Sequence, residues 1–414
     1  MRGRLYGSSA GVGPMSRRAL LAGLSAVAGL GLLPGGPARA ARKGKLLVWW
    51  SGGGWDPTYA FDLHPESDLA QDPASEVRSA GDLRWVSSPR RPAVDAFFEL
   101  HGPRAVILNG VAVGSISHGT CTVLSLTGTR SRDRADLTAQ VGAAAGAELA
   151  LPTLSLGGPS FPGEHGAVVT PISGLMSGTL AGRLPRAAPA VSADEARVQA
   201  FLRAEGDALQ GRRGQAWRAG LDRLAALGPA ADLLAMPDAP THEDRASVAL
   251  QALSSGLTRA ALLPAPLPER GTWDTHFQND MQQSEAFETS FDALNTLLAQ
   301  MAEMPGVDGS LLDETVVLLM SEMGRAPVLN PALGKDHWPT TSWVVMGSGV
   351  AGGRVLGHTS SALAARPVDP ATGLPDDGGE LLSPAHVLAG IAAGFGVDTA
   401  AAWPGVRPLL GLWG

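Results

Sequence analysis

Residue types that could carry chemistry gather at four places along the chain. These are Gly54-Trp55-Asp56, Ser117-His118-Gly119-Thr120, Trp273-Asp274-Thr275-His276 and Asp336-His337. Carboxylate oxygen and imidazole nitrogen together form the donor set that suits zinc, manganese or iron. We therefore expect a divalent metal cofactor, Zn, Mn or Fe, at a site that holds one or two ions. Such ions polarise an ester oxygen and lower the pKa of a bound water or hydroxyl.

Each cluster also has a simpler interpretation when it is taken alone. Asp56 precedes a proline and could be a turn residue, and Asp274 could cap a helix. Glu322 and Arg325 could pair only with each other. The metal hypothesis depends on the conjunction of several such clusters, three of them after predicted strands and the one at 273–276 after a proline-rich linker.

Other catalytic schemes have weaker support in the sequence. The Gly-x-Ser-x-Gly pattern occurs only at residues 7–11, inside the expected export signal, so residues 41–414 lack the nucleophile elbow of the α/β-hydrolases. The glycines at 52–54 lack the spacing of a dinucleotide-binding loop, and there is no Walker A motif. Cys121 could be a nucleophile, but its apolar surroundings favour a small buried thiol.

Four short apolar runs predict the strands that would position these clusters. They are residues 45–50, 104–109, 315–320 and 342–346. Continuous apolar runs indicate strands buried on both faces, which implies a largely parallel sheet with helices on both sides. Helical periodicity covers 192–235 and 285–304, and a proline-rich linker is expected at 263–268. In such a sheet, chemistry collects on loops at the carboxyl ends of strands.

The first 40 residues are typical of an export signal. Ser16-Arg17-Arg18 opens an apolar stretch to Leu33, and Ala38-Arg39-Ala40 would be the cleavage site. We expect the twin-arginine export machinery as a partner and a periplasmic or extracellular location, with no stable membrane span after cleavage. An uncleaved membrane anchor is the alternative, but the apolar stretch is shorter than the roughly 20 residues that spanning requires.

Charge and composition narrow the class of protein further. The chain is 44% hydrophobic and 17% charged, as expected of a globular protein with a substantial core. Loss of the five arginines in residues 1–40 would change the formal charge from −7 to −12. So acidic a chain argues against a nucleic-acid partner. The one cysteine, Cys121, excludes an intramolecular disulfide.

With these motifs in place, the sequence resembles the DUF1501 family of exported bacterial proteins, within the alkaline phosphatase and sulfatase superfamily. The resemblance is carried by "GGGWDPTYAFDLHP" (52–65), "SHGTCTVLSLTGT" (117–129), "WDTH" (273–276), "SEMGRAPVLNPALGKDHWP" (321–339) and "GSGVAGGRVLGHTS" (347–360). It implies an α/β fold, a three-layer α/β/α sandwich with a largely parallel central sheet. It also implies one domain over 41–414, with a helical insertion at about 190–262.

The resemblance also implies roles for particular residues in a two-metal site for phosphate or sulfate esters. The metal ligands would be Asp56, Asp274, His276, Asp336, His337 and His358. His118 aligns with the superfamily's nucleophile position, and Ser117 and Thr120 flank it. Attack could come from either hydroxyl or from a metal-bound water, or no covalent chemistry occurs. Arg325 or Lys335 would offset charge on the transferred group.

The sequence is compatible with two functions, one enzymatic and one not. The first is an exported metal-dependent hydrolase of small-molecule phosphate or sulfate esters. The second is a non-catalytic binding or envelope-assembly protein on the same fold, because function lives in the site and not in the fold. One departure from the superfamily bears on both: its Asp-x-x-x-His motif is shortened here to Asp274-Thr275-His276.

Overall fold

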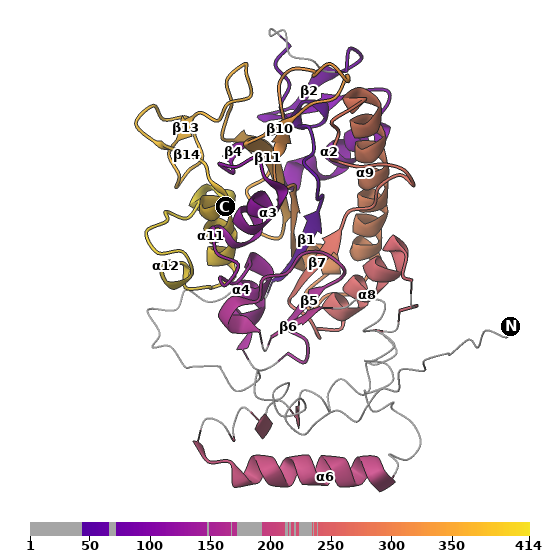
Figure 1. Ribbon diagram of the computed structural model, residues 1–414, viewed down its shortest axis with the longest axis vertical. Helices are drawn as coiled ribbons and strands as arrows, with labels where there is room; N and C mark the ends of the chain where they lie inside the picture. The colour runs from indigo at the N-terminus through magenta and orange to yellow at the C-terminus, as the bar shows by residue number, and fades with distance from the viewer. Residues whose placement is uncertain are drawn as a thin grey trace, which may run out of the picture.

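A computed structural model gives the arrangement of the chain (Figure 1). It describes residues 44–65, 72–146, 149–166, 168–171, 193–211 and 239–414, together with positions 214, 217–218, 221–222, 234 and 236–237. The expected export signal at 1–40 lies outside these residues. Much of the helical stretch expected at 192–235 also lies outside them.

An eight-stranded sheet forms the middle layer. Its strands are β1 (Lys45–Trp50), β4 (Ala105–Ala112), β5 (Thr153–Ser155), β6 (Val169–Pro171), β7 (Ala260–Pro264), β8 (Thr315–Met320), β11 (Thr340–Gly347) and β12 (Arg354–Leu356). Their order across the sheet is β12-β4-β11-β8-β1-β7-β5-β6. Only β11 pairs antiparallel to its neighbours, β4 and β8. The expected largely parallel sheet is confirmed.

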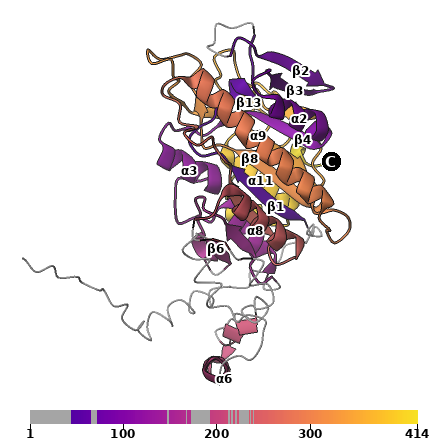
Figure 2. The same cartoon turned by 90° about the vertical axis from the view of Figure 1, so that its right-hand side faces the viewer.

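Helices cover both faces of this sheet (Figures 1 and 2). On one side lie α2 (Pro92–His101), α8 (His242–Ser254) and α9 (Asn279–Glu303), and on the other lie α3 (His118–Thr127), α4 (Leu137–Ala144) and α11 (Pro384–Gly394). Helices α10 (Leu311–Glu314) and α12 (Thr399–Ala402) are short, and α6 (Ala193–Ala208) lies away from the sheet. The three-layer α/β/α sandwich is therefore also confirmed.

In the described part of the chain, three small two-stranded pairings lie outside this sheet. They are β2 (Glu76–Ala80) with β3 (Leu83–Ser87), β9 (Gly324–Arg325) with β10 (His337–Trp338), and β13 (Pro367–Val368) with β14 (Glu380–Leu381). The β9–β10 pair folds the charged segment after β8 back on itself, with His337 opposite Arg325. This hairpin-like return brings His337 to the carboxyl end of the sheet.

The core forms where apolar residues of the central strands meet the helices. Every residue of β1 and β8 is buried. On α9, Phe287, Phe291, Leu294 and Leu298 follow helical spacing and are buried toward the sheet. The ring of Phe291 meets that of Phe97 on α2 edge to face, with the centroids 5.2 Å apart. This packing holds α9 against α2 and the sheet. The first residues of α9 lie beside the site described below.

The four predicted strands are found within a few residues of their expected ends, as β1, β4, β8 and β11. The structure differs at 260–264, whose last two residues overlap the proline-rich linker expected at 263–268. These residues form β7, between β1 and β5 in the sheet. Pro264 stands at the last position of the strand, where its missing N–H interrupts the ladder least. Within the described part of the chain, no helix has the length and apolar character needed to span a bilayer.

Candidate metal centre

Polar segments that follow β1, β4, β7 and β8 meet at one edge of the sheet. These strands are parallel to one another, so their carboxyl ends share that edge. Those after β4, β7 and β8 carry His118, Asp274, His276, Glu322 and His337, and the one after β1 contributes the Gly53 N–H, which donates to Glu322. His118 is the first residue of α3, and Glu322 lies two residues beyond the end of β8. The fold thus gathers residues that are up to about 220 positions apart in sequence.

Asp274 lies at the middle of this group. Its Oδ1 is 3.1 Å from His337 Nε2 and 3.2 Å from His276 Nε2. Its Oδ2 is 3.2 Å from His118 Nε2. Single ligand atoms of His118, Asp274 and His337 all lie within 4.8 Å of one another, which is close enough for one metal ion. Three imidazoles therefore turn the same nitrogen, Nε2, toward one carboxylate.

The other nitrogen of each imidazole is anchored to an acceptor. His118 Nδ1 lies 2.8 Å from Glu322 Oε1, His276 Nδ1 lies 3.1 Å from Asp336 Oδ1, and His337 Nδ1 lies 2.7 Å from the carbonyl oxygen of Ile116. A carbonyl accepts but cannot donate, and an ionised carboxylate likewise only accepts. Each Nδ1 must then carry the proton. In the neutral ring this leaves a lone pair on Nε2, the tautomer that a metal ligand requires.

The arrangement of the three Nε2 atoms fits a cation. His276 Nε2 and His337 Nε2 lie 3.0 Å apart, and two lone pairs at that distance repel unless a proton or metal ion lies between them. His118 Nε2 is buried and makes no hydrogen bond within the described residues, although Asp274 lies nearby. The group within 4.8 Å, two imidazole nitrogens and one carboxylate oxygen, matches the donor preference of zinc, manganese or iron, and His276 lies beside it.

The charges around the centre are set by neighbouring groups. Partial burial raises the pKa of Asp274, but hydrogen bonds from Arg325 and His337 outweigh it and lower that pKa to about 2. Asp274 is therefore a carboxylate at any physiological pH. The hydrogen bond to Glu322 raises the pKa of His118. A metal ion bound at Nε2 would replace the second proton of the His118 ring, on the side of Asp274, and leave the Nδ1 proton in its hydrogen bond to Glu322.

Arg325 fixes Asp274 and does not face solvent. Its side chain is fully buried, and its Nη2 lies 2.8 Å from Asp274 Oδ1. Its Nε donates to the carbonyl oxygen of Gly54 at 2.7 Å, its Nη1 donates to that of Lys335 at 3.2 Å, and its Nη2 also donates to that of Gly53. These internal bonds leave the guanidinium committed to positioning Asp274, away from the place where it could bind a substrate.

Asp56 is placed apart from the cluster, in a buried ion pair. Its Oδ2 lies 2.6 Å from Lys335 Nζ, and both side chains are completely buried. Asn279 Nδ2 donates to the same oxygen at 3.0 Å, and the Oδ1 accepts from the amide and hydroxyl of Thr58. Asp56 is thus saturated with donors, and the ammonium of Lys335 neutralises it without any metal.

His358 also lies elsewhere. It lines a separate cavity of about 440 Å³ together with Asp62, His64 and Thr359. The Thr359 hydroxyl donates to Asp62 Oδ2 at 2.7 Å and lies 2.8 Å from His64 Nε2. No predicted ligand other than His358 lines this cavity. His358 therefore has a polar environment of its own, distinct from the group around Asp274.

The two candidate hydroxyls flank the cluster. Ser117 precedes α3 and is exposed, and Thr120 is half-buried in its first turn. The sequence assigned His118 to the nucleophile position, whereas the structure turns its ring toward Asp274. Glu322 is a residue that sequence reasoning did not place in the site. Its position at the end of a buried strand was the available signal, because a charge there needs a partner.

Asp336 was expected to bind metal, and the structure gives it a supporting position. Its side chain is 67% exposed, and its Oδ1 accepts from His276 and from Asn330 Nδ2. Loss of such an outer partner typically weakens metal binding about 10- to 100-fold. Asp336→Asn is expected to weaken metal affinity by that amount without abolishing binding, as measured by competition with a chromogenic chelator. Complete loss of binding would instead make Asp336 a direct ligand.

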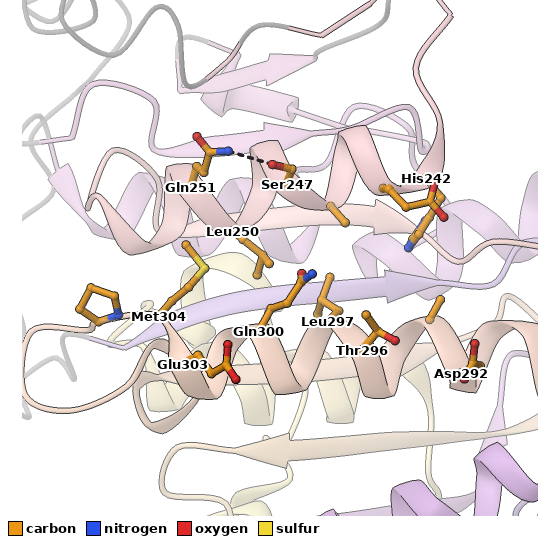
Figure 3. A pocket seen from close by; sticks show the side chains of 14 residues that line it. His242, Ser247, Leu250, Gln251, Asp292, Thr296, Leu297, Gln300, Glu303 and Met304 are labelled. Atoms are coloured by element: carbon orange, nitrogen blue, oxygen red, sulfur yellow. Dashed lines mark hydrogen bonds between the residues drawn. The ribbon is translucent and has the colours of Figure 1, made fainter.

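A larger cavity lies away from this centre. It occupies about 770 Å³ between α8 and α9, and Figure 3 shows Leu250, Leu297 and Gln300 lining its middle. Its carboxylates, Glu243, Asp292 and Glu303, come from the two helices, and it contains none of the predicted metal ligands.

Comparison with known proteins gives one family match and several similar structures. Residues 242–376 match the model of a family described as a protein of unknown function, DUF1501. No curated protein sequence matches significantly. The lipoteichoic acid synthase LtaP from Listeria monocytogenes is similar over 94% of this chain and 80% of its own, with 9% identity and a TM-score of 0.40. A protein in the alkaline phosphatase superfamily from Vibrio parahaemolyticus is similar over 96% and 79%, with 12% identity and a TM-score of 0.43.

Proposed function

We propose that this chain is an exported, metal-dependent hydrolase of phosphate or sulfate esters. The observation that carries the proposal is the convergence of three histidine Nε2 atoms on the Asp274 carboxylate, each with its Nδ1 already anchored. His118, Asp274 and His337 would hold the ion, and His276, whose Nε2 lies 3.0 Å from that of His337, would add a fourth ligand. The family match over 242–376 includes three of these four residues, and His118 lies before the matched range.

A single ion is favoured over the two that the resemblance implies. Among the described residues, one group of three or more potential ligands is close enough to share an ion. The aspartate that would help to hold a second ion is Asp56, and Lys335 already lies 2.6 Å from its carboxylate. An ammonium group at this position supplies the positive charge that a second metal would otherwise bring.

The chemistry follows from what surrounds the centre. A divalent ion bound there would act as a Lewis acid toward an ester oxygen and a bound water. Ser117 or Thr120 could provide a hydroxyl, because both lie within two residues of His118. The first turn of α3 presents backbone N–H groups at the same edge, which favours a bound anion. Arg132 is exposed beside this turn, with Nη2 3.6 Å from where a Cβ of Gly119 would stand, so it could neutralise the ester's charge.

The proposal is tested by measuring metal and activity together. The 41–414 chain, purified without chelator, is expected to hold about one Zn, Mn or Fe per chain and to hydrolyse 4-nitrophenyl phosphate or 4-nitrophenyl sulfate. Chelation should abolish both properties, and metal addition should restore them. A metal-free chain that takes up no ion on titration would refute the proposal. A metal-bound chain inert toward both ester classes would favour the binding or envelope-assembly function instead.

A further inference from the structure

Large apolar side chains are exposed around the candidate metal centre. They are Ile116, Phe277, Met281, Val328, Leu329 and Leu333, and we call this set the apolar rim. Their exposed fractions run from 44% for Met281 and Leu329 to 64% for Leu333. Single exposed apolar residues are ordinary on a protein surface, but a contiguous group generally marks a binding site.

The rim shares its backbone with the metal ligands. Ile116 provides the carbonyl oxygen that accepts from His337 Nδ1 at 2.7 Å. Phe277 directly follows His276, and its backbone pairs with that of Leu333 in an isolated antiparallel bridge. Met281 lies in the first turn of α9, four residues beyond Phe277. The rim and the metal ligands therefore belong to the same segments of the chain.

A single loop, residues 326–334, carries the other half of the rim. It begins after Arg325 and returns to Asp336 and His337. Asn330 holds it in place, because its Nδ2 donates to the carbonyl oxygen of His276 at 3.0 Å and to Asp336 Oδ1 at 3.2 Å. Gly334 packs so closely that a Cβ there would collide with the backbone of His276. The loop is thus fixed against the ligand segment, and its apolar side chains do not fold inward.

Backbone strain is concentrated at the same place. Leu333 has a φ of 56° and Gln278 a φ of 47°, both in the left-handed region that side chains other than glycine rarely occupy. In the described part of the chain, Leu363 is the one other non-glycine residue with a positive φ. The cost at Leu333 is not offset by burial, because its side chain is 64% exposed. Strain that holds a leucine in solvent beside a candidate site points to a role in binding.

We propose that the apolar rim binds the hydrocarbon part of the substrate, so that the enzyme acts on amphiphilic esters with a long alkyl group. This inference rests on the proposed function, because the anionic ester group would be the part presented to the metal centre. The rim would discriminate between substrates by burying additional methylene groups, each of which adds to affinity when it leaves water. Small polar esters would lack this contribution.

A substrate suits the rim better than a second macromolecule does. The Asp336 carboxylate is 67% exposed between Leu333 and His337, and a flat protein surface over the rim would bury it without a cationic partner. A slender alkyl chain can lie along the rim and leave Asp336 in water. The formal charge of −12 expected for residues 41–414 also opposes approach to an anionic membrane surface.

The test compares two unreactive ligands with the same head group and different chains. Butylphosphonate and octylphosphonate, both below their aggregation concentrations, are titrated into the metal-loaded 41–414 chain by calorimetry. We expect the octyl compound to bind at least about 10-fold more tightly, well below the limit for four fully buried methylenes. Leu333→Asn should remove most of this difference, because asparagine tolerates the left-handed backbone while lacking the apolar side chain. Val328→Ser is a second rim variant, at a residue whose backbone is not in the left-handed region, and it should also reduce the difference.

Leu100→Asn is the matched control, since Leu100 is 72% exposed on α2 and outside the rim. It should keep the full preference for the octyl chain. Equal affinities for the two phosphonates in the parent would overturn the rim proposal while leaving the metal centre intact. A parent chain that binds no metal, as measured separately, would overturn both the rim proposal and the proposed hydrolase function. A dimer that Leu333→Asn converts to a monomer, without any chain-length effect, would show that a second copy covers the rim, and would also overturn the proposal.

Discussion

Asp274→Asn is expected to weaken metal binding by at least about 100-fold, more than the loss of an outer partner such as Asp336. The reason is that Asp274 lies within 3.2 Å of Nε2 on all three histidines and, with a pKa of about 2, contributes a full negative charge. Asparagine keeps the size and one oxygen acceptor for Arg325, so that the fold is preserved. Metal content per chain and competition with a chromogenic chelator are the measurements.

His358→Ala is the informative control for Asp274→Asn. The resemblance makes His358 a ligand, whereas the structure places it in the cavity with Asp62 and Thr359. We therefore expect metal binding by His358→Ala to be unchanged. If His358→Ala lost the ion and Asp274→Asn kept it, the metal would lie at a site other than the group around Asp274. Thermal unfolding of both variants would confirm that neither change acts through loss of the fold.

Lys335→Met is expected to lower the free energy of unfolding by about 3–5 kcal/mol, because it leaves the Asp56 carboxylate buried without its counter-charge. Both side chains of the pair are completely buried, so water cannot compensate. Methionine keeps much of the lysine stem's volume, which limits the contribution of a cavity. Urea unfolding followed by tryptophan fluorescence gives the free energy directly.

Two comparisons show whether charge is the cause. The double variant Asp56→Leu/Lys335→Met should recover part of the lost stability, because it removes the uncompensated charge. Arg407→Ala breaks an exposed ion pair with Glu380 that has the same 2.6 Å separation, and it should have a far smaller effect. Equal effects of Lys335→Met and Arg407→Ala would refute a special role for the buried pair. An additional metal ion bound by Lys335→Met would show that the ammonium excludes a second ion.

Most of the sheet was predictable because burial on both faces leaves a local mark in the sequence. Apolar runs at 45–50 and 315–320 match β1 and β8 at both ends. The strand at 260–264 was missed, because its short run of alanine and leucine ends in a proline-rich segment. What makes those residues a strand is pairing with β1 and β5, which are distant in sequence.

The sequence also indicated which segments carry the chemistry. Asp274, His276 and His337 were expected together at the carboxyl edge of the sheet, and the structure brings them together. The sequence could not assign a role to each member of a cluster. His118 was assigned the nucleophile position and Asp336 was expected to bind metal, yet the His118 ring turns toward Asp274 and the Asp336 carboxylate supports His276 from outside. Such a difference depends on side-chain direction, which neither spacing nor residue type determines.

By itself, then, the sequence determined the class of fold, the edge of the sheet where ligands collect and the donor types available for a divalent ion. These follow from local patterns, because strand burial and side-chain chemistry are written in neighbouring residues. Only the tertiary structure decided that Asp56 pairs with Lys335, that Glu322 orients His118 and that His358 lies in another cavity. Each of these contacts joins residues far apart in the chain, and its existence depends on how helices and loops pack over the sheet.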